Sequence, residues 1–240
     1  HLERTPIVVS RAVAEHAVYE LSLRRLGVAV RRLAPAPHLP DAVFVEDTAV
    51  VFDELAIITR PGAESRRPEC RAVAESLAAH RSLEIIEEPA MLDGGDVLVD
   101  GKRVYVGRSS RTNETAIAQL ARILHPLDYR VIPVDFRGCL HLKSAVARIG
   151  EGLLLLNPDW VEASVFAGAR IVTVDPREPH AANALAVAGS VIHPLQYPLT
   201  RVRLEAEGLS VDPVDTTELT KAEAGVTCCS LIVRVGPRVG

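Results

Sequence analysis

Residues able to do chemistry recur at one position of a repeated pattern in this 240-residue chain. Each of these residues lies where the first of two short apolar strands is expected to begin. The repeated units start near residues 48, 96, 140, 182 and 226, so successive starts are 48, 44, 42 and 44 residues apart. The residues at this position are Glu46 and Asp47, Asp93 and Asp96 of a DGGD motif, His141, Asn183 and Cys228. Carboxylates, an imidazole and a thiol are the groups of acid–base and nucleophilic catalysis.

The repeated unit reads as two apolar strands joined by a tight turn, a polar loop, a helix and another apolar strand. Its clearest copy predicts strands over residues 96–99 and 103–106 around an Asp-Gly hairpin turn, a helix capped by Thr112 or Asn113, and a strand over 130–135. In the copy before it, the helix is predicted from about Pro68. The third copy predicts a strand over 144–147 and a short helix around Trp160. A steady period of this size indicates stacked or radially arranged units.

The fifth unit is split between the two ends of the chain. Residues 228–235 supply its first strand, while a helix over 12–26 and a strand over 28–33 supply its remainder. This split favours a closed ring, in which the chemistry-bearing positions of all units face one central axis. Only one strand is unaccounted for, and we expect it to precede His1.

Composition narrows the classes of function. The net charge is −4 and the isoelectric point about 6.1, so a basic field for nucleic acid is not expected. The longest apolar run, residues 184–188, is too short to span a membrane. The four cysteines show no CxxC or Cys/His zinc spacing, so we expect no metal site and a reducing, cytoplasmic compartment.

Each candidate also has a structural interpretation. A cysteine in an apolar strand is often an inert buried thiol, a lone histidine is often structural, and paired acids often mark a solvated edge. The DGGD motif could be a turn, and Arg66 and Arg111 could be exposed charges. The shared phase in the repeat favours the functional interpretation. Cys139 and Cys229 lack that phase and are assigned to packing.

Six motifs carry a resemblance to a known family. They are PDAVFVED (40–47), TRPGAESRR (59–67), LDGGDV (92–97), SRTN (110–113), LHLKS (140–144) and GVTCCS (225–230). In this order they resemble the dimethylarginine dimethylaminohydrolases of the pentein superfamily, over nearly the whole chain. The resemblance implies an α/β fold, a five-fold pseudosymmetric ββαβ propeller with a single catalytic domain over residues 1–240.

The resemblance also implies the roles of the site residues. Cys228 is expected to be the nucleophile, His141 the general acid and base, and Asp93 its acidic partner at the guanidinium. Three acids are expected on the substrate's guanidinium side: Asp41, Glu46 and Asp47. Two arginines, Arg66 and Arg111, are expected to hold the substrate's amino-acid end. Glu223 stands five residues before the nucleophile, where the family usually has Asp.

The implied reaction converts an Nω-methylated arginine to citrulline and dimethylamine through a covalent thiouronium on the cysteine. This scheme requires no metal or organic cofactor, takes a small-molecule substrate, and leaves a homodimer open. The nearest alternative is another pentein activity, such as arginine or agmatine deimination. The paired arginines fit a free carboxylate and so argue against agmatine. A non-catalytic guanidino-compound binding protein is the alternative from a different class.

Overall fold

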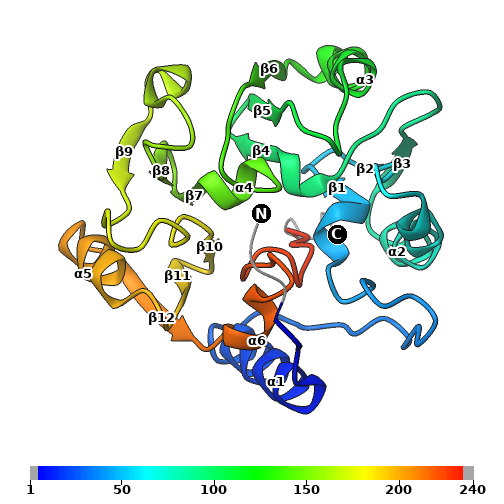
Figure 1. The fold of residues 1–240 in the computed structure, drawn as a ribbon. Helices are drawn as coiled ribbons and strands as arrows, with labels where there is room; N and C mark the ends of the chain where they lie inside the picture. The colour runs from blue at the N-terminus through cyan, green and yellow to red at the C-terminus, as the bar shows by residue number, and fades with distance from the viewer. Residues whose placement is uncertain (1–4, 235–240) are drawn as a thin grey trace, which may run out of the picture.

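Four three-stranded sheets surround a common centre in the computed structural model, which describes residues 5–234 (Figure 1). The first two sheets contain β1 (Ala49–Val51), β2 (Leu55–Ile58), β3 (Ser82–Ile85), β4 (Val97–Asp100), β5 (Arg103–Gly107) and β6 (Arg130–Val134). The other two contain β7 (Val146–Gly150), β8 (Leu153–Leu156), β9 (Arg170–Thr173), β10 (Leu185–Val187), β11 (Ser190–Pro194) and β12 (Ser210–Val214). The sheets confirm the predicted repeat of strand, strand and returning strand.

Every sheet has the same pairing. The middle strand pairs antiparallel with the first strand of its unit and parallel with the third, as in the register Asp100↔Arg103 and Arg103↔Arg130. The predicted hairpin turn is present, with Gly101 in the left-handed region at φ 58°. In each sheet the first and third strands both pair with the middle strand. The middle strand is also buried by side-chain packing; β8, for example, is buried throughout.

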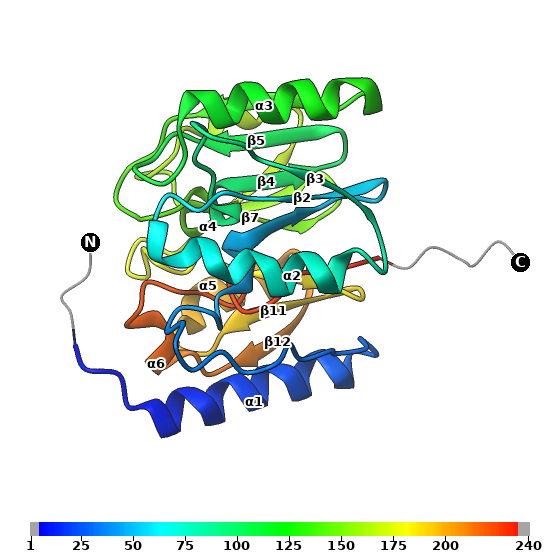
Figure 2. The same cartoon turned by 90° about the vertical axis from the view of Figure 1, so that its right-hand side faces the viewer.

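The longer helices lie at the rim, and one short helix lies near the centre (Figures 1 and 2). The longer helices are α1 (Val9–Arg25), α2 (Cys70–Leu77), α3 (Glu114–Leu124) and α5 (Pro198–Ala206), and the short ones are α4 (Leu142–Ala145) and α6 (Thr217–Thr220). The 3₁₀ turns are η1 (Val45–Thr48), η2 (Glu64–Glu69), η3 (Gly94–Asp96), η4 (His125–Leu127) and η5 (Ala163–Phe166). Within residues 5–234, none of the helices has the length and apolarity to cross a membrane.

The sequence explains the two helices nearest the site. Asn113 caps α3, its side-chain oxygen accepting the N–H of Ala116, as the sequence predicts. Pro68 lies inside η2, and α2 follows directly with Cys70, Val73 and Leu77 buried on one face. These aliphatic faces pack against the sheets and hold the strand starts at the centre.

The third unit differs from the prediction in two places. Residues 144–147 were expected to form a strand, but α4 continues through Ala145 and β7 begins only at Val146. The helix turn forms because Ser144 N–H bonds to the carbonyl of His141, which turns the chain at the centre. The expected helix around Trp160 is replaced by η5, a few residues later.

The fifth sector also differs. α1 confirms the predicted helix, but residues 28–33 and 228–234 are not strands, and residue 235 lies outside the described residues. In the other sheets each outer strand forms its hydrogen bonds with a middle strand. Among residues 5–234 no middle strand lies between these two segments, so their backbone groups have no strand with which to pair. α1 is instead held by its side chains, since buried Glu15 accepts the backbone N–H groups of Glu218 and Leu219.

Candidate active site

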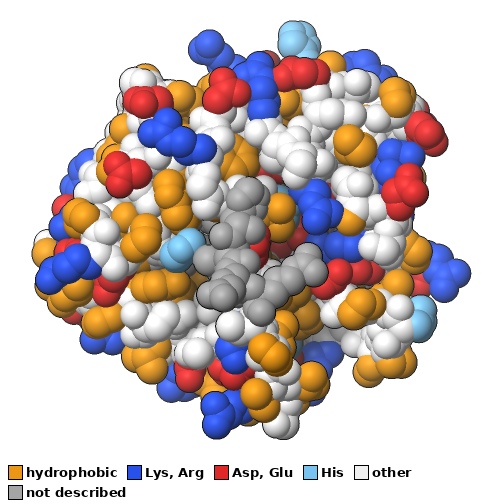
Figure 3. Space-filling model, in the orientation of Figure 1, with side chains coloured by type: hydrophobic (Ala, Val, Ile, Leu, Met, Phe, Trp, Pro, Cys, Tyr) orange, Lys and Arg blue, Asp and Glu red, His pale blue; other side chains and the backbone are white. Residues whose placement is uncertain are grey.

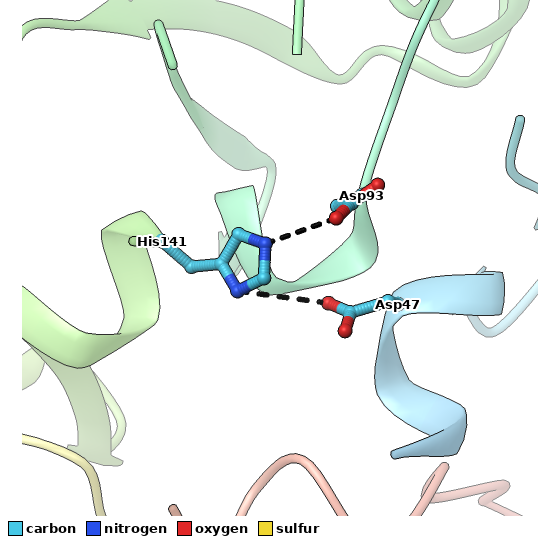
Figure 4. Close-up of side chains that lie close together, drawn as sticks. All are labelled: Asp47, Asp93 and His141. Atoms are coloured by element: carbon cyan, nitrogen blue, oxygen red, sulfur yellow. Dashed lines mark hydrogen bonds and ion pairs between the residues drawn. The ribbon is translucent and has the colours of Figure 1, made fainter. Parts of the chain in front are cut away.

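Three chemistry-bearing residues from separate units meet at the centre of the ring. Asp47 lies in η1 before β1, Asp93 precedes η3 and β4, and His141 precedes α4. His141 Nε2 lies 3.0 Å from Asp93 Oδ2, and His141 Nδ1 lies 3.8 Å from Asp47 Oδ1 (Figure 4). The predicted convergence of strand starts is thus confirmed for these three residues.

The imidazole of His141 is held between carboxylates. Burial alone would lower the pKa of His141, but the charges of Asp47, Asp93 and Asp96 and the hydrogen bond to Asp93 outweigh it and raise the pKa to about 9. The ring is therefore an imidazolium at neutral pH and donates a hydrogen bond to Asp93. A group in this state can give a proton to a leaving amine.

Asp47 stays ionised in spite of its burial. Burial opposes ionisation, but the His141 and Arg66 cations and the N–H of Gly95 lower the pKa of Asp47 below its usual range. Gly95 allows this close approach: a Cβ there would lie 2.7 Å from His141 Nδ1 and 2.8 Å from Asp47 Oδ1. The second glycine of the motif thus admits both side chains.

Asp96 completes the support of the imidazole and was not assigned a role from sequence. Its carboxylate is fully buried and accepts hydrogen bonds from the hydroxyls of Ser109 and Thr112 and from the N–H of Leu142. The last bond fixes the start of α4 beside His141. The sequence feature that could have indicated this role is the position of Asp96 as the second acid of the DGGD motif.

The two arginines differ in their surroundings. The guanidinium of Arg66 is buried and donates to the carboxylates of Asp47 and Glu69 and to the carbonyl of Phe44. These acids raise the pKa of Arg66 further above its usual range, although burial opposes them. Arg111 is partly exposed, and its guanidinium has no hydrogen-bond partner among residues 5–234.

The loops that carry Arg111 and Asp93 lie against each other. A Cβ on Gly62 would lie 2.7 Å from the Arg111 Cα, and the Gly62 N–H donates to Asp93 Oδ1. Arginine and lysine side chains and acidic side chains gather beside the centre of the face seen in Figure 3. Gly62 therefore contacts both the Arg111 backbone and the carboxylate of Asp93.

The other two predicted acids occupy different places. Asp41 lies beside Arg66, to which its backbone carbonyl accepts a hydrogen bond of 3.3 Å. Glu46 is buried, with one carboxylate oxygen 2.6 Å from Lys143 Nζ and the other 2.7 Å from Thr227 Oγ1. Glu46, Lys143 and Thr227 also line a cavity of about 680 Å³. Both oxygens of Glu46 thus have protein partners.

Cys228 lies next to the acid-bearing turn η1. Its carbonyl accepts the N–H of Glu46 at 3.1 Å, and its Sγ lies 3.2 Å from the N–H of Gly225. Burial and the negative charges of Glu46 and Asp47 raise the pKa of Cys228 well above its usual range. The thiol is therefore neutral in the unliganded protein.

Ionisation does not single out a nucleophile among the four free cysteines. Burial raises the pKa of Cys70 to about 11 and those of Cys139 and Cys229 to about 12. Cys229 packs into a hydrophobic cluster with Tyr19 and Leu23, consistent with its expected packing role. Position beside the acids, rather than pKa, distinguishes Cys228.

Glu223 lines a second cavity, of about 410 Å³, together with Cys139, His180 and Gly225. Its backbone is in the left-handed region at φ 59°. Its negative charge acts to raise the pKa of His180, although burial lowers that pKa overall. The residue at this position therefore faces a cavity that adjoins the Cys228 loop.

The three central residues could also ligate a metal ion. Among residues 5–234, Asp47, Asp93 and His141 each offer one ligand atom, all within 4.8 Å of one another. The imidazolium of His141 would first have to lose a proton, and Asp47 already pairs with Arg66. The group is better suited to bind a cation that itself donates hydrogen bonds.

Comparison with known proteins places the chain in a family. The family model described as "N,N dimethylarginine dimethylhydrolase, eukaryotic" matches residues 3–167. An N(G),N(G)-dimethylarginine dimethylaminohydrolase of Streptomyces coelicolor is 38% identical over 236 residues, which cover 98% of this chain and 90% of the relative. The enzyme of the same name from Pseudomonas aeruginosa is 36% identical over 226 residues, covering 92% and 88%.

A solved structure is similar over the same range. It is a cysteine-to-serine mutant of the Pseudomonas aeruginosa enzyme in complex with citrulline, with a TM-score of 0.91, 33% identity, and coverage of 95% of this chain and 90% of that one. These relatives and this solved structure show that the protein, with its α/β fold, is a hydrolase of amidine C–N bonds. The chain belongs to the dimethylarginine dimethylaminohydrolase family.

Proposed function

We propose that the protein hydrolyses Nω,Nω-dimethylarginine to citrulline and dimethylamine. The observation that carries this proposal is the meeting of the Asp47 and Asp93 side chains with protonated His141 beside the Cys228 segment. Relatives of 36% and 38% identity named for this reaction support it over most of the chain. The substrate is a small cation, and buried carboxylates are the groups that bind it.

The acids bind the guanidinium and Arg111 binds the carboxylate of the substrate. Asp47 and Asp93 accept hydrogen bonds from the guanidinium N–H groups, with Asp41 at the margin. The guanidinium of Arg111, which has no hydrogen-bond partner among residues 5–234, makes a bidentate contact with the α-carboxylate. Arg66 adds positive charge on the same side and orients Asp47 through their ion pair.

Substrate binding prepares the nucleophile. The carboxylates that keep the Cys228 thiol neutral are the groups that the guanidinium neutralises, so a bound cation favours the thiolate. The thiolate then attacks the guanidinium carbon and forms a C–S bond. As the C–N bond to the dimethylated nitrogen breaks, that nitrogen takes a proton from His141 and leaves as dimethylamine.

Hydrolysis completes the cycle. The remaining Cys228 thiouronium is attacked by water, which gives one proton to His141, now acting as a base. The C–S bond breaks, the sulfur leaves as a thiolate, and the carbon keeps the water oxygen as the ureido group of citrulline. The second water proton passes from the new hydroxyl to the sulfur and restores the neutral Cys228 thiol, while the proton that the thiol loses on substrate binding ends on the released dimethylamine. The scheme uses no cofactor.

We propose that the fold is the five-fold ββαβ propeller of the pentein superfamily, with residues 1–240 as one catalytic domain. Four sheets of identical pairing around one centre support this, with α1 at the rim of the remaining sector (Figure 1). The free state of all four cysteines supports the cytoplasmic location expected from sequence.

A panel of guanidino compounds tests the proposed reaction. Dimethylarginine, monomethylarginine, arginine and agmatine are each incubated with the protein, and the ureido product and released amine are quantified together. We expect equal amounts of citrulline and dimethylamine from dimethylarginine. Faster ammonia release from arginine would favour a deiminase instead, and binding of dimethylarginine without either product would favour the binding-protein alternative.

A further inference from the structure

A hydrogen-bonded network joins three of the four segments that carry the reactive groups, those of Asp47, His141 and Cys228, and Asn183 lies at its centre. Asn183 is buried, 6% exposed, and lies two residues before the start of β10. Its Nδ2 donates to the carbonyl of Lys143 at 3.1 Å and to Thr227 Oγ1 at 3.0 Å. Its Oδ1 accepts the N–H of Thr227 at 3.1 Å. The amide nitrogen and the amide oxygen of Asn183 therefore both form hydrogen bonds with residues of other units.

The partners of Asn183 are sequence neighbours of the reactive residues. Lys143 lies two residues after His141, and Thr227 lies one residue before Cys228. In Figure 1, the C-terminal segment drawn in red lies near the centre, between β10 and β1. Asn183 therefore ties the acid–base segment directly to the nucleophile segment.

Glu46 closes the network from the third side. Its carboxylate accepts the Thr227 hydroxyl and the Lys143 ammonium, and its N–H donates to the carbonyl of Cys228. Glu46 in turn precedes Asp47. The segments of Asp47, His141 and Cys228 are thus each held at or beside the reactive residue, by bonds that leave the reactive atoms themselves uninvolved.

Asn183 also packs directly on the Cys228 loop. A Cβ on Gly225 would lie 2.2 Å from Asn183 Cγ, so the amide touches this backbone, and the Gly225 N–H points to Cys228 Sγ. The loop has no strand ladder of its own within the described residues. The position of the Cys228 loop therefore depends strongly on these side-chain bonds. The positions of Asp93 and His141 depend on them less.

We infer that Asn183 is a positioning residue, which sets Cys228 relative to His141 through Thr227 and Lys143. This inference rests on the proposed function, because it assumes that Cys228 attacks the substrate. Displacement of a reacting group by about 1 Å can cost about 100-fold in rate. Loss of the network should therefore lower kcat much more than it changes KM.

The test compares Asn183→Ala with Asn157→Ala as a matched control. The side chain of Asn157 is also buried and holds a loop, through bonds to the carbonyl of Pro179 and the N–H of Asp159, but among residues 5–234 it has no bond to the segments of Asp47, His141 and Cys228. We expect Asn183→Ala to lower kcat about 10- to 100-fold with KM changed less than about threefold. Asn157→Ala should keep its kcat.

A second pair of variants covers a failure of Asn183→Ala to fold. Thr227→Val removes the hydroxyl bonds to Asn183 and Glu46 and should reduce kcat, whereas Thr227→Ser keeps the hydroxyl and should restore it. The double variant Asn183→Ala/Thr227→Val should lose little more than the worse single variant, because both remove the same bond. Unchanged kcat in the folded single variants, or an equal loss in Asn157→Ala, would overturn the inference.

A measurement that needs no turnover separates this inference from the proposed function. Iodoacetamide alkylation of Cys228, followed by peptide mass mapping, should be several-fold faster in Asn183→Ala, because the loosened loop exposes the sulfur. Inactivity of the wild type on every guanidino compound would contradict the proposed function alone. An alkylation rate equal to that of the wild type would contradict the positioning role.

Discussion

The proposed acid–base half and the proposed nucleophile half of the site are built differently. Asp47, Asp93 and His141 lie at the starts of units whose sheets are complete, and His141 is hydrogen-bonded to Asp93 and paired with Asp47 before any substrate arrives. Cys228 lies in a segment without a described strand, and its thiol is held neutral by the neighbouring acids. One half is therefore preorganised, and the other depends on the substrate cation for its charge.

The difference has a chemical consequence. A permanently ionised thiol would react with any electrophile, whereas a thiol that ionises only beside a bound cation is selective for guanidino compounds. The following predictions test whether the two halves depend on their parts in this way, in order of decreasing expected effect.

Replacement of the nucleophile should have the largest effect. Cys228→Ser should lower kcat by about 10⁴-fold or more, because a hydroxyl at this place has no thiolate to form. Cys229→Ser is the matched control and should keep most of the activity, as its sulfur packs in the core. Steady-state citrulline formation measures both, and a full loss in Cys229→Ser with retention in Cys228→Ser would reverse the assignment.

Neutralising the acidic partner should alter the acid–base half. Asp93→Asn should lower kcat about 10²- to 10⁴-fold, since the acid–base group loses its orienting partner. It should also lower the pKa of His141, because a raising charge is gone. In the wild type, activity that needs the imidazolium declines as pH rises through about 9; in the variant this alkaline limb should move down by about one to three pH units. An unmoved limb would contradict the role of Asp93.

Substitutions of the two arginines should affect different kinetic constants. Arg111→Ala should raise KM for dimethylarginine about 10- to 150-fold, through loss of about 1.5–3 kcal/mol of charged hydrogen bonding, and should leave a decarboxylated analogue unaffected. Arg66→Ala should reduce kcat as well, because Asp47 loses its buried cation. Equal effects of Arg111→Ala on both compounds would show that Arg111 does not bind the carboxylate.

The smallest effect is on stability. The pKa of His141 is raised in the folded state, so its proton stabilises the fold fully below pH 6.5, and this contribution is lost as pH rises through about 9. Tm should therefore fall more between pH 6.5 and 9.5 in the wild type than in His141→Gln, by about 2–4 °C for each kcal/mol lost. Parallel curves from calorimetry would contradict the raised pKa.

The repeat phase was enough to predict which main-chain positions meet. Asp47, Asp93 and His141 each stand at the start of a unit, and periodicity alone places such positions on one axis. The directions of side chains were not predictable in this way. Glu46 and Asp47 are adjacent, yet one turns to Lys143 and the other to His141, because the 3₁₀ turn η1 points them to different sides.

Burial and pairing account for the other differences. The bond of Arg66 to Asp47 joins separate segments, so no spacing in the sequence indicates it, whereas the bond to Glu69 lies within η2 at a spacing of three residues. The expected strands over residues 28–33 and 228–235 had the right apolar composition. A strand requires a neighbour for its hydrogen bonds as well as composition, and this neighbour is not visible in a local pattern.

The central claim is that the two halves meet in one covalent step at Cys228, and trapping that step tests it most directly. The protein is mixed with excess dimethylarginine, quenched in acid during turnover, digested and analysed by mass spectrometry. The account predicts a peptide containing Cys228 that is heavier by the substrate less dimethylamine, present during turnover and absent after the substrate is consumed. Active turnover with that adduct on another cysteine, or citrulline formation at the wild-type rate by Cys228→Ser, would contradict it.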